Sequence, residues 1–304
     1  MSEEIISVTP ELIHDLIPPR LVSSKKGDNG IVLVVGGSGI YHGAPLLSTL
    51  SALRSGVDLV YTAVPKSVVT PLRSFSPNVI ALPFSNDRFT ISSAKQLLKI
   101  LPKKPDVVAI GMGMIIEKPE SLVYMVKELK SMGTKLLLDA SALIPEILES
   151  ISGSNTIVTP HFGEYKRLFQ KEENYNEIVD TTTTLQEQTS NVYKLAKKYG
   201  ITIILKGYND IICKGSQQQK TIAVIKRTTP AMTVGGCGDV LSGVVAGMLT
   251  KLQDVFSASI VGVYLSGIAA DLAYQRVGLH MIATDLIEEL PNAMKSFDKI
   301  ISKP

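Results

Sequence analysis

Short apolar runs recur along this chain of 304 residues, and most are followed by a turn and then by a helical pattern. Runs that are apolar on both faces are typical of strands buried in a parallel sheet with helices on each side. They cover residues 31–35, 59–64, 79–82, 107–110, 135–138, 156–158 and 201–205. The alternation predicts a doubly wound α/β fold, with a mostly parallel sheet flanked by helices and right-handed crossovers.

Helical patterns fill the intervals between these runs. They cover residues 44–54, 94–101, 121–130 and 191–199, and a further helix is expected over 240–250. Two more runs, 210–213 and 221–225, are separated by a polar segment and predict a hairpin on the edge of the sheet. Beyond this hairpin the chain is expected to be nearly all helical. The polar, Thr-rich stretch 171–184 is expected to be an exposed loop.

We expect one domain over residues 1–304, with the ligand site at the carboxyl ends of the strands. The 31 basic and 28 acidic residues give a net charge of +3, which offers no electrostatic reason to expect nucleic acid or an anionic membrane as a partner. Two cysteines, Cys213 and Cys237, are too few for a disulfide framework, and the acidic N-terminus lacks the apolar run of a secretory signal. The apolar stretch 240–274 is interrupted by charged residues, which favours buried helices over a membrane span. These features predict a soluble cytoplasmic protein.

The strongest chemical signal is a glycine-rich turn before the expected helix 240–250; it consists of Gly235, Gly236, Cys237, Gly238 and Asp239. Glycines at a helix start present unpaired N–H groups and the positive end of the helix dipole, which together hold an anion such as phosphate. Asp239 could then accept a proton from an attacking hydroxyl. The same residues also allow a plain tight turn with Asp239 as a helix cap. Cys237 has no evident His partner, so we expect its backbone N–H to matter and not its thiol.

Other segments follow the ends of predicted strands. His161 and Glu164 could contact a substrate and hold Mg²⁺ through water, or could be a loop residue and a helix-terminal carboxylate. The glycine-rich turn 36–44 lacks the spacing of a dinucleotide-binding turn, but it could admit another ligand. Each of the segments 111–113 and 206–207 could lie close to a ligand or could simply form a turn.

Taken in order, these segments resemble one family. They are 26–30, 36–44, 111–113, 138–140, 159–164, 205–207 and 230–239. The chain is similar to the NAD(P)H-hydrate dehydratases of the ribokinase-like superfamily. This resemblance implies a three-layer α/β/α fold and a repair enzyme. Its substrates would be the S-epimers of NADH and NADPH hydrated at nicotinamide C6, known as NADHX and NADPHX.

The resemblance also implies roles for individual residues. A nucleotide would phosphorylate the C6 hydroxyl and phosphate would then leave, with Asp239 taking the hydroxyl proton. The transferring phosphoryl group would be stabilised by the N–H groups of Gly236, Cys237 and Gly238. The hydrated dinucleotide would contact Ala44, Gly113, His161 and Asp239. The nucleotide would be held by Lys206, Gly207, Tyr208, Asn209, Asp210 and Gly238, and Glu164 would position Mg²⁺ through water.

The sequence departs from the family pattern at three positions. Cys237 stands where Ser is usual, Ser141 where a second Asp is usual, and Ile115 where Gly is common. The last two departures put local ligand contacts in question. The donor is ADP or ATP, and resemblance to the prokaryotic branch favours ADP. Fewer residues precede the first expected strand than an independent domain needs, so a separate epimerase would act upstream. The resemblance further implies a homo-oligomer, specifically a tetramer.

Two alternatives stay open on the sequence. A small-molecule kinase of the same superfamily, of the thiazole or hydroxymethylpyrimidine type, would use an Asp base at the same turn. Such a kinase would accumulate a phosphorylated product. A non-catalytic adenine-nucleotide sensor would bind nucleotide without turnover.

Overall fold

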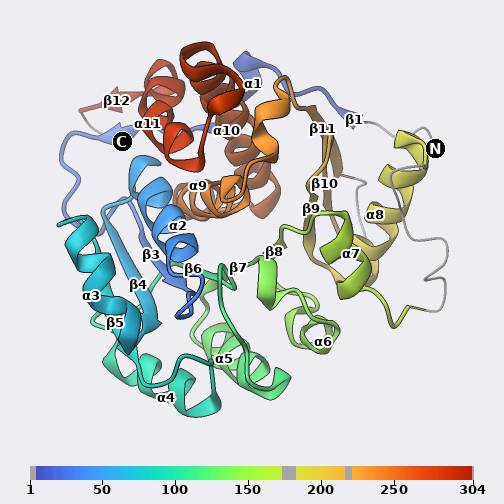
Figure 1. Ribbon diagram of the computed structural model, residues 1–304. Coiled ribbons are helices and arrows are strands. Elements are labelled where there is room, and N and C mark those ends of the chain that lie inside the picture. Colours follow the sequence, from blue (N-terminus) through green and yellow to red (C-terminus); the bar gives the residue numbers. More distant parts are fainter. Residues whose placement is uncertain (1–4, 173–182, 216–220, 303–304) are drawn as a thin grey trace.

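A ten-stranded, mostly parallel sheet forms the centre of the molecule (Figure 1), seen in a computed structural model that describes residues 5–172, 183–215 and 221–302. The strand order is β1-β11-β10-β9-β8-β7-β6-β3-β4-β5. Only β10 runs antiparallel to its two neighbours. The bounds are β1 (Ile5–Ile6), β3 (Ile31–Val35), β4 (Leu59–Pro65), β5 (Ile80–Phe84), β6 (Val107–Ile110), β7 (Lys135–Leu138), β8 (Thr156–Val158), β9 (Thr202–Leu205), β10 (Asn209–Lys214) and β11 (Thr221–Lys226).

Helices cover both faces of this sheet, so the central strands are buried on both sides. In β3, Val32 and Val34 belong to one hydrophobic core and Ile31, Leu33 and Val35 to the other, as the two-residue period of a strand requires. The first core is covered by α1 (Pro10–Leu16), α2 (Gly43–Arg54), α9 (Cys237–Lys251), α10 (Val255–Val277) and α11 (Ala283–Met294). The second lies against α4 (Ile91–Ile100), α5 (Pro119–Ser131), α6 (Leu148–Ile151), α7 (Phe162–Leu168) and α8 (Leu185–Tyr199), while α3 (Lys66–Phe75) lies beside β4 and β5. The predicted three-layer α/β/α class is confirmed.

Two glycines of α9 allow α2 to pack unusually close. A Cβ on Gly243 would lie 2.1 Å from the carbonyl oxygen of Ser48, and one on Gly247 would lie 1.7 Å from Ser55 Oγ. Ser48 Oγ also donates to the carbonyl oxygen of Asp239 at 2.8 Å. The contact therefore fixes the start of α9 against the first half of α2.

The seven predicted strands and the helices between them are confirmed, most with small shifts at their ends, although the helix expected over 191–199 begins six residues earlier, at Leu185. The run at 79–82 begins at Ile80 and extends to Phe84, and the helix expected over 240–250 begins at Cys237. The hairpin is confirmed as β10 and β11, but its predicted position at the sheet edge is wrong because β1 pairs in parallel with β11 outside it. Two-residue β1 is too short to show any periodicity.

The prediction of a nearly all-helical C-terminal part is confirmed by α9, α10 and α11, with one short strand besides. β12 (Ile300–Ile301) pairs in parallel with β2 (Arg20–Leu21), and both are two-residue strands without a sequence pattern. The exposed loop expected over 171–184 lies mostly outside the described residues, as does part of the polar segment between β10 and β11.

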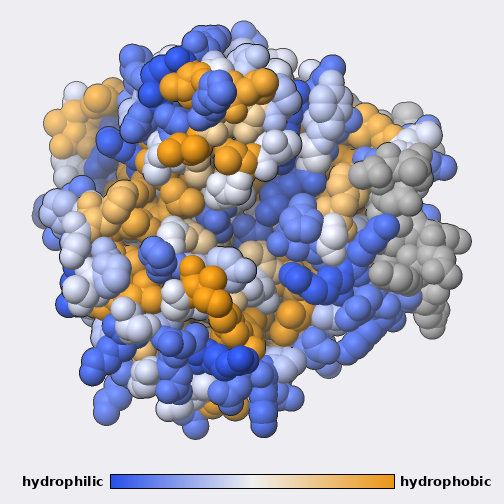
Figure 2. Space-filling model, in the orientation of Figure 1, coloured by the Kyte–Doolittle hydropathy of each residue, from blue (hydrophilic) through white to orange (hydrophobic). Residues whose placement is uncertain are grey.

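One helical segment, Val255–His280, is long and apolar enough by length and composition to cross a membrane. Within the molecule, 67% of its most apolar window is buried. Such burial is typical of a core helix, and α10 indeed contacts α9, α11 and the strands β8 to β11. Figure 2 shows apolar and hydrophilic groups mixed over one face of the molecule, with apolar groups also at the top, where Figure 1 draws the C-terminal helices.

Candidate functional site

The glycine-rich turn lies at the start of α9, as predicted. Gly236 is the residue before the helix and has a left-handed φ of +96°. A Cβ at this position would lie 2.7 Å from Leu47 Cδ1, so both the backbone conformation and the space favour glycine. The N–H of Cys237 is 3.5 Å from the carbonyl oxygen of Val234, a weak hydrogen bond that leaves it available to an incoming anion. Asp239 lies within the first turn of the helix.

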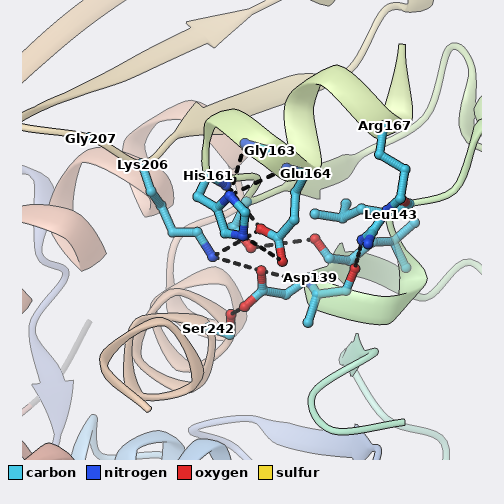
Figure 3. Close-up of polar contacts among 12 residues, drawn as sticks. Asp139, Leu143, His161, Gly163, Glu164, Arg167, Lys206, Gly207 and Ser242 are labelled. Carbon is cyan, nitrogen blue, oxygen red and sulfur yellow. Dashed lines mark hydrogen bonds and ion pairs between the residues drawn. The ribbon is translucent and has the colours of Figure 1, made fainter. Parts of the chain in front are cut away.

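A cluster of charged side chains lies beside this turn (Figure 3). Lys206 Nζ is 2.9 Å from Asp139 Oδ1 and 3.7 Å from Glu164 Oε2. Ser242, one turn after Asp239 on α9, donates to Asp139 Oδ2 at 2.6 Å. The side chains of Lys206, Asp139 and Glu164 are only 11%, 2% and 12% exposed. Asp139 follows β7 and Lys206 follows β9, so the carboxyl ends of parallel strands bring them together, as the sequence predicted for the ligand site.

This surrounding changes the acidity of Asp239. Its pKa is raised to about 7, mainly by burial and also by the charges of Asp139 and Glu164, while the charge of Lys206 opposes this rise. Burial alone would lower the pKa of Lys206, but the charges of Asp139 and Glu164 outweigh it and leave that pKa raised. Lys206 is therefore charged at neutral pH. Asp239 can both accept and release a proton there, which suits a general base.

The thiol of Cys237 has no such reactivity. Its side chain is buried, and burial raises the pKa of the thiol to about 11. A thiol of this kind stays protonated at neutral pH and is a poor nucleophile. This agrees with the expectation that only the backbone of Cys237 matters.

His161 and Glu164 form the N-terminal cap of α7. His161 Nδ1 accepts from the N–H groups of Gly163 and Glu164 at 3.0 and 3.3 Å, and Glu164 Oε2 accepts from the His161 N–H at 2.9 Å. Glu164 is therefore a helix-terminal carboxylate, which is one of the two roles that the sequence left open for it. The His161 side chain is 60% exposed, so it can also meet a ligand. The ligand roles of both residues stay predictions.

Two neighbouring cavities contain most of the predicted nucleotide-binding residues. One, of about 330 Å³, is lined by residues that include His161, Lys206, Asp210, Cys237 and Gly238. The other, of about 770 Å³, is lined by Gly207 and Tyr208 together with Phe162, Pro230 and others. Arg227, Met232 and Thr233 line both, so the cavities adjoin. Asn209 is the first residue of β10, next to Tyr208.

The carboxylate of Asp210 is already engaged within the protein. It accepts from Arg227 Nη2 at 2.9 Å and Nε at 3.2 Å, and from the Gly207 N–H at 2.9 Å. A nucleotide in these cavities would therefore contact Arg227 and the Gly207 backbone, both of which are held in place by Asp210. Arg227 received no role from the sequence.

Ala44 lies at the start of α2, and Gly113, in the turn after β6, packs against it. Gly113 has a φ of +66°, and a Cβ on it would lie 3.0 Å from that of Ala44 and 2.5 Å from the Tyr41 carbonyl oxygen. Ser48, one turn after Ala44, is bonded to the Asp239 backbone. The two predicted substrate-binding residues therefore adjoin each other, and α2 links them to Asp239.

Metal ligands are sparse in this site. In the described parts of the chain, no group of three or more His, Cys, Asp or Glu side chains could hold a metal ion. Glu164 Oε2 is bonded to the His161 N–H and faces Lys206. A Mg²⁺ that keeps its waters and binds nucleotide phosphates needs few protein ligands, so a water-mediated role for Glu164 fits these residues better than direct coordination.

Residues 32–292 match the sequence model of the NAD(P)H-hydrate dehydratase family. The chain belongs to this family. It is 45% identical over 295 residues to the ADP-dependent (S)-NAD(P)H-hydrate dehydratase of Nitrosopumilus maritimus, covering 97% of this chain and 99% of that protein. It is 43% identical to the enzyme of the same name from Cenarchaeum symbiosum, covering 95% and 96%. The bifunctional NAD(P)H-hydrate repair enzyme of Pyrobaculum aerophilum is 38% identical, but only 53% of its length is matched.

Solved structures share the fold of this chain. The ADP/ATP-dependent NAD(P)H-hydrate dehydratase of Bacillus subtilis, crystallised with ATP and Mg²⁺, has a TM-score of 0.78 and 25% identity, covering 95% of this chain and 98% of that one. A ribokinase-like protein from Enterococcus faecalis has a TM-score of 0.77 and 22% identity over 96% of each chain. A hydroxyethylthiazole kinase from Pyrococcus horikoshii, at 13% identity and a TM-score of 0.59 over 94% of this chain and 95% of that one, shares the fold alone.

The members of the charged cluster were only partly found by sequence reasoning. Glu164 and Lys206 were named, but Asp139 and Ser242 were given no role. Asp139 directly follows β7 in a segment that resembles the dehydratase family, and this position was the available signal. Nothing in the sequence pairs it with Ser242, which lies 103 residues away.

Proposed function

We propose that this chain is an ADP-dependent (S)-NAD(P)H-hydrate dehydratase that restores NADH and NADPH from NADHX and NADPHX. The observation that carries the proposal is the position of Asp239. It lies in the first turn of a glycine-headed helix, beside a buried Lys206, with a pKa raised to about 7. The two relatives of 45% and 43% identity, both named as ADP-dependent, support ADP over ATP as donor.

The first chemical step is phosphoryl transfer. The carboxylate of Asp239 takes the proton of the C6 hydroxyl, whose oxygen attacks the terminal phosphorus of ADP. The bond from this phosphorus to the bridging oxygen breaks, and AMP leaves. N–H groups of Gly236, Cys237 and Gly238 stabilise charge on the transferring group, and donors of this kind typically contribute a few kcal/mol each. Lys206 stays charged beside them and holds the nucleotide phosphates.

The second step is elimination of phosphate. The C6–O bond breaks with its electron pair on the phosphate while the nicotinamide nitrogen donates its lone pair toward C6. Loss of a proton from C5 then restores the ring double bond. Hydroxide is a poor leaving group and phosphate a good one, which is why the reaction consumes a nucleotide. Ala44, Gly113 and His161 contact the hydrated dinucleotide in this proposal.

The remaining nucleotide contacts come from the two adjoining cavities. The adenine nucleotide is held by Lys206, Gly207, Tyr208 and Gly238 in this proposal. Asn209 adjoins Tyr208, and Asp210 acts by holding Arg227 and the Gly207 N–H. Mg²⁺ would be held by the nucleotide phosphates, with Glu164 acting through water, and would neutralise phosphate charge.

The wider setting of the enzyme is also part of the proposal. Residues 1–304 act as one cytoplasmic domain, without a membrane or nucleic-acid partner, and a separate NAD(P)H-hydrate epimerase converts the R-epimer. We propose a homo-oligomer, specifically a homotetramer. Exposed apolar side chains at Tyr274, Leu279 and Ile282 support an interface on the C-terminal helices.

The test is the absorbance of reduced nicotinamide when the protein is added to hydrated NADH with Mg²⁺, in parallel with ADP and with ATP. Recovery of NADH with release of AMP and phosphate is expected with ADP. A stable phosphorylated product with no recovery would indicate the kinase alternative. Nucleotide binding without any turnover would indicate the sensor.

A further inference from the structure

Ala140, directly after Asp139, has a backbone conformation that alanine rarely adopts. Among the described residues it is the one non-glycine residue with positive φ, at +51°. For an L-residue, this region costs the equivalent of roughly a 5- to 30-fold change in an equilibrium. Such a conformation persists only where the surroundings fix it, and functional sites are common places for it.

Hydrogen bonds fix the peptide planes on both sides of Ala140. On one side, the Ala140 N–H donates to Asp139 Oδ1 at 2.9 Å, and the Asp139 carbonyl accepts from the Ala142 N–H at 3.0 Å. On the other side, the Ala140 carbonyl accepts from the Leu143 N–H at 3.2 Å and from Arg167 Nη2 at 2.7 Å. The arginine supplies the shortest of these contacts.

Arg167 holds this turn at two points from another element (Figure 3). It lies on α7, one turn after Glu164, and its Nε donates to the Leu143 carbonyl at 3.0 Å. One guanidinium thus spans the short 3₁₀ helix η1 (Ala140–Ala142) that follows Asp139. The opposite side of the turn packs on Gly111, where a Cβ would lie 1.9 Å from the Asp139 carbonyl oxygen.

We propose that Arg167 is a positioning residue for phosphoryl transfer: it holds the turn at Ala140, so that Asp139 keeps Lys206 in place beside Asp239. Asp139 Oδ1 accepts from both the Ala140 N–H and Lys206 Nζ, at 2.9 Å each. A turn that relaxes at Ala140 therefore moves the carboxylate that holds Lys206. The changes in kcat expected below rest on the proposed function, whereas the changes in ADP binding do not.

The competing explanation is that Arg167 merely stabilises the fold by bonding the carbonyls of η1. The two explanations differ in what a glycine at position 140 does. Glycine adopts positive φ without penalty, so it can keep the turn in place when the arginine is lost. A general loss of packing would not be repaired by removing one methyl group.

The experiment compares wild type, Arg167→Ala, Ala140→Gly and the double variant. Arg167→Ala is expected to lower kcat about 5- to 30-fold with little change in KM for NADHX, and the double variant to recover to within about threefold of Ala140→Gly. Arg167→Lys, whose single ammonium cannot span both carbonyls, gives an intermediate kcat and serves if Arg167→Ala does not fold. Arg73→Ala is the matched control, because Arg73 also donates to a backbone carbonyl, that of Ala81, at 3.2 Å.

Calorimetric titration with ADP and Mg²⁺ gives a second readout that does not depend on turnover. Arg167→Ala is expected to weaken ADP binding by a similar factor, and Ala140→Gly to restore it. Wild-type kcat in folded Arg167→Ala, or no recovery in the double variant, would overturn the proposal. A wild type that binds ADP but does not convert NADHX would overturn the proposed function instead, while the titrations still decide the role of Arg167.

Discussion

Lys206 Nζ lies 2.9 Å from Asp139 Oδ1, although the two residues are 67 positions apart in the sequence. Their strands, β9 and β7, are separated in the sheet by β8, so the ion pair spans the end of that strand. Both side chains are almost fully buried. A buried ion pair adds little net stability, but loss of one partner leaves the other charge uncompensated, which is costly.

Replacement of the lysine should therefore destabilise the protein strongly. In Lys206→Met, Asp139 and Glu164 lose the cation between them, and we expect the free energy of unfolding to fall by about 3–5 kcal/mol. Urea denaturation at neutral pH measures it. Lys171→Met is the control, because the Lys171–Glu146 pair is exposed at the surface and should change stability by less than about 1 kcal/mol. Equal effects of the two substitutions would contradict this account.

Removal of the proposed base should abolish turnover without preventing nucleotide binding. In Asp239→Asn, we expect kcat to fall by roughly 10²- to 10⁴-fold, because the amide cannot accept the hydroxyl proton. NADH recovery measures kcat, and calorimetry checks that ADP still binds. Near wild-type turnover in a folded variant would remove Asp239 from the mechanism.

The thiol of Cys237 should be dispensable. Cys237→Ser keeps the backbone N–H at the start of α9, so we expect turnover close to that of the wild type in the same NADH-recovery assay. A large fall in kcat, with ADP binding intact, would show that the sulfur itself takes part.

The pH dependence follows from the raised pKa of Asp239. The proposed mechanism needs the carboxylate form of Asp239, so kcat/KM in the free enzyme should rise with pH through about 7 and then level off. A profile that is flat between pH 5 and pH 9, where substrate and ADP remain stable, would exclude this group as the base. The plateau marks the range in which Asp239 is fully deprotonated.

The raised pKa of Asp239 also makes the free energy of unfolding depend on pH. The folded state binds the Asp239 proton more tightly than the unfolded chain, whose Asp has a pKa near 3.8. Unfolding free energy should therefore fall between about pH 4 and pH 7 through this group, and the loss is complete above pH 7. Asp239→Asn should be more stable than wild type at pH 8, by up to about 4 kcal/mol, and this gain should shrink at pH 5. Thermal unfolding at the two pH values measures it.

The close contact of α2 and α9 can be tested by replacing a glycine at the contact with alanine. Gly243→Ala should cost about 1–3 kcal/mol of unfolding free energy, because the added methyl would lie 2.1 Å from the Ser48 carbonyl oxygen. Gly267→Ala on α10 is the control: in the described part of the chain no other heavy atom lies within 4 Å of its Cβ position. It should be neutral or stabilise by up to about 1 kcal/mol. Denaturant midpoints compare the two.

The central sheet was predicted well because buried parallel strands leave short runs that are apolar on both faces. β6, β7 and β8 match their predicted bounds. The two-residue strand β1 was not predicted because so short a segment has no periodicity. The hairpin was therefore expected at the edge of the sheet. Prediction of the site depended on a glycine-rich turn at a helix start and on turns at strand ends, which is why Asp239 and Lys206 were found. The contacts of Asp139 with Ser242 and of Asp210 with Arg227 could not be predicted, because they depend on strand order and helix rotation.

The glycine contact between α2 and α9 also limits how this active site can be re-engineered. Gly243 and Gly247 leave no clearance between the helices, and Ser48 ties α2 to the backbone of Asp239. Ala44 and the proposed base, Asp239, therefore lie on one rigid unit, and neither helix can slide to admit a bulkier alcohol. A redesign for a larger substrate must instead remove volume at exposed residues of the adjoining turn, such as Ile40 and Tyr41, where side chains can change without moving the base.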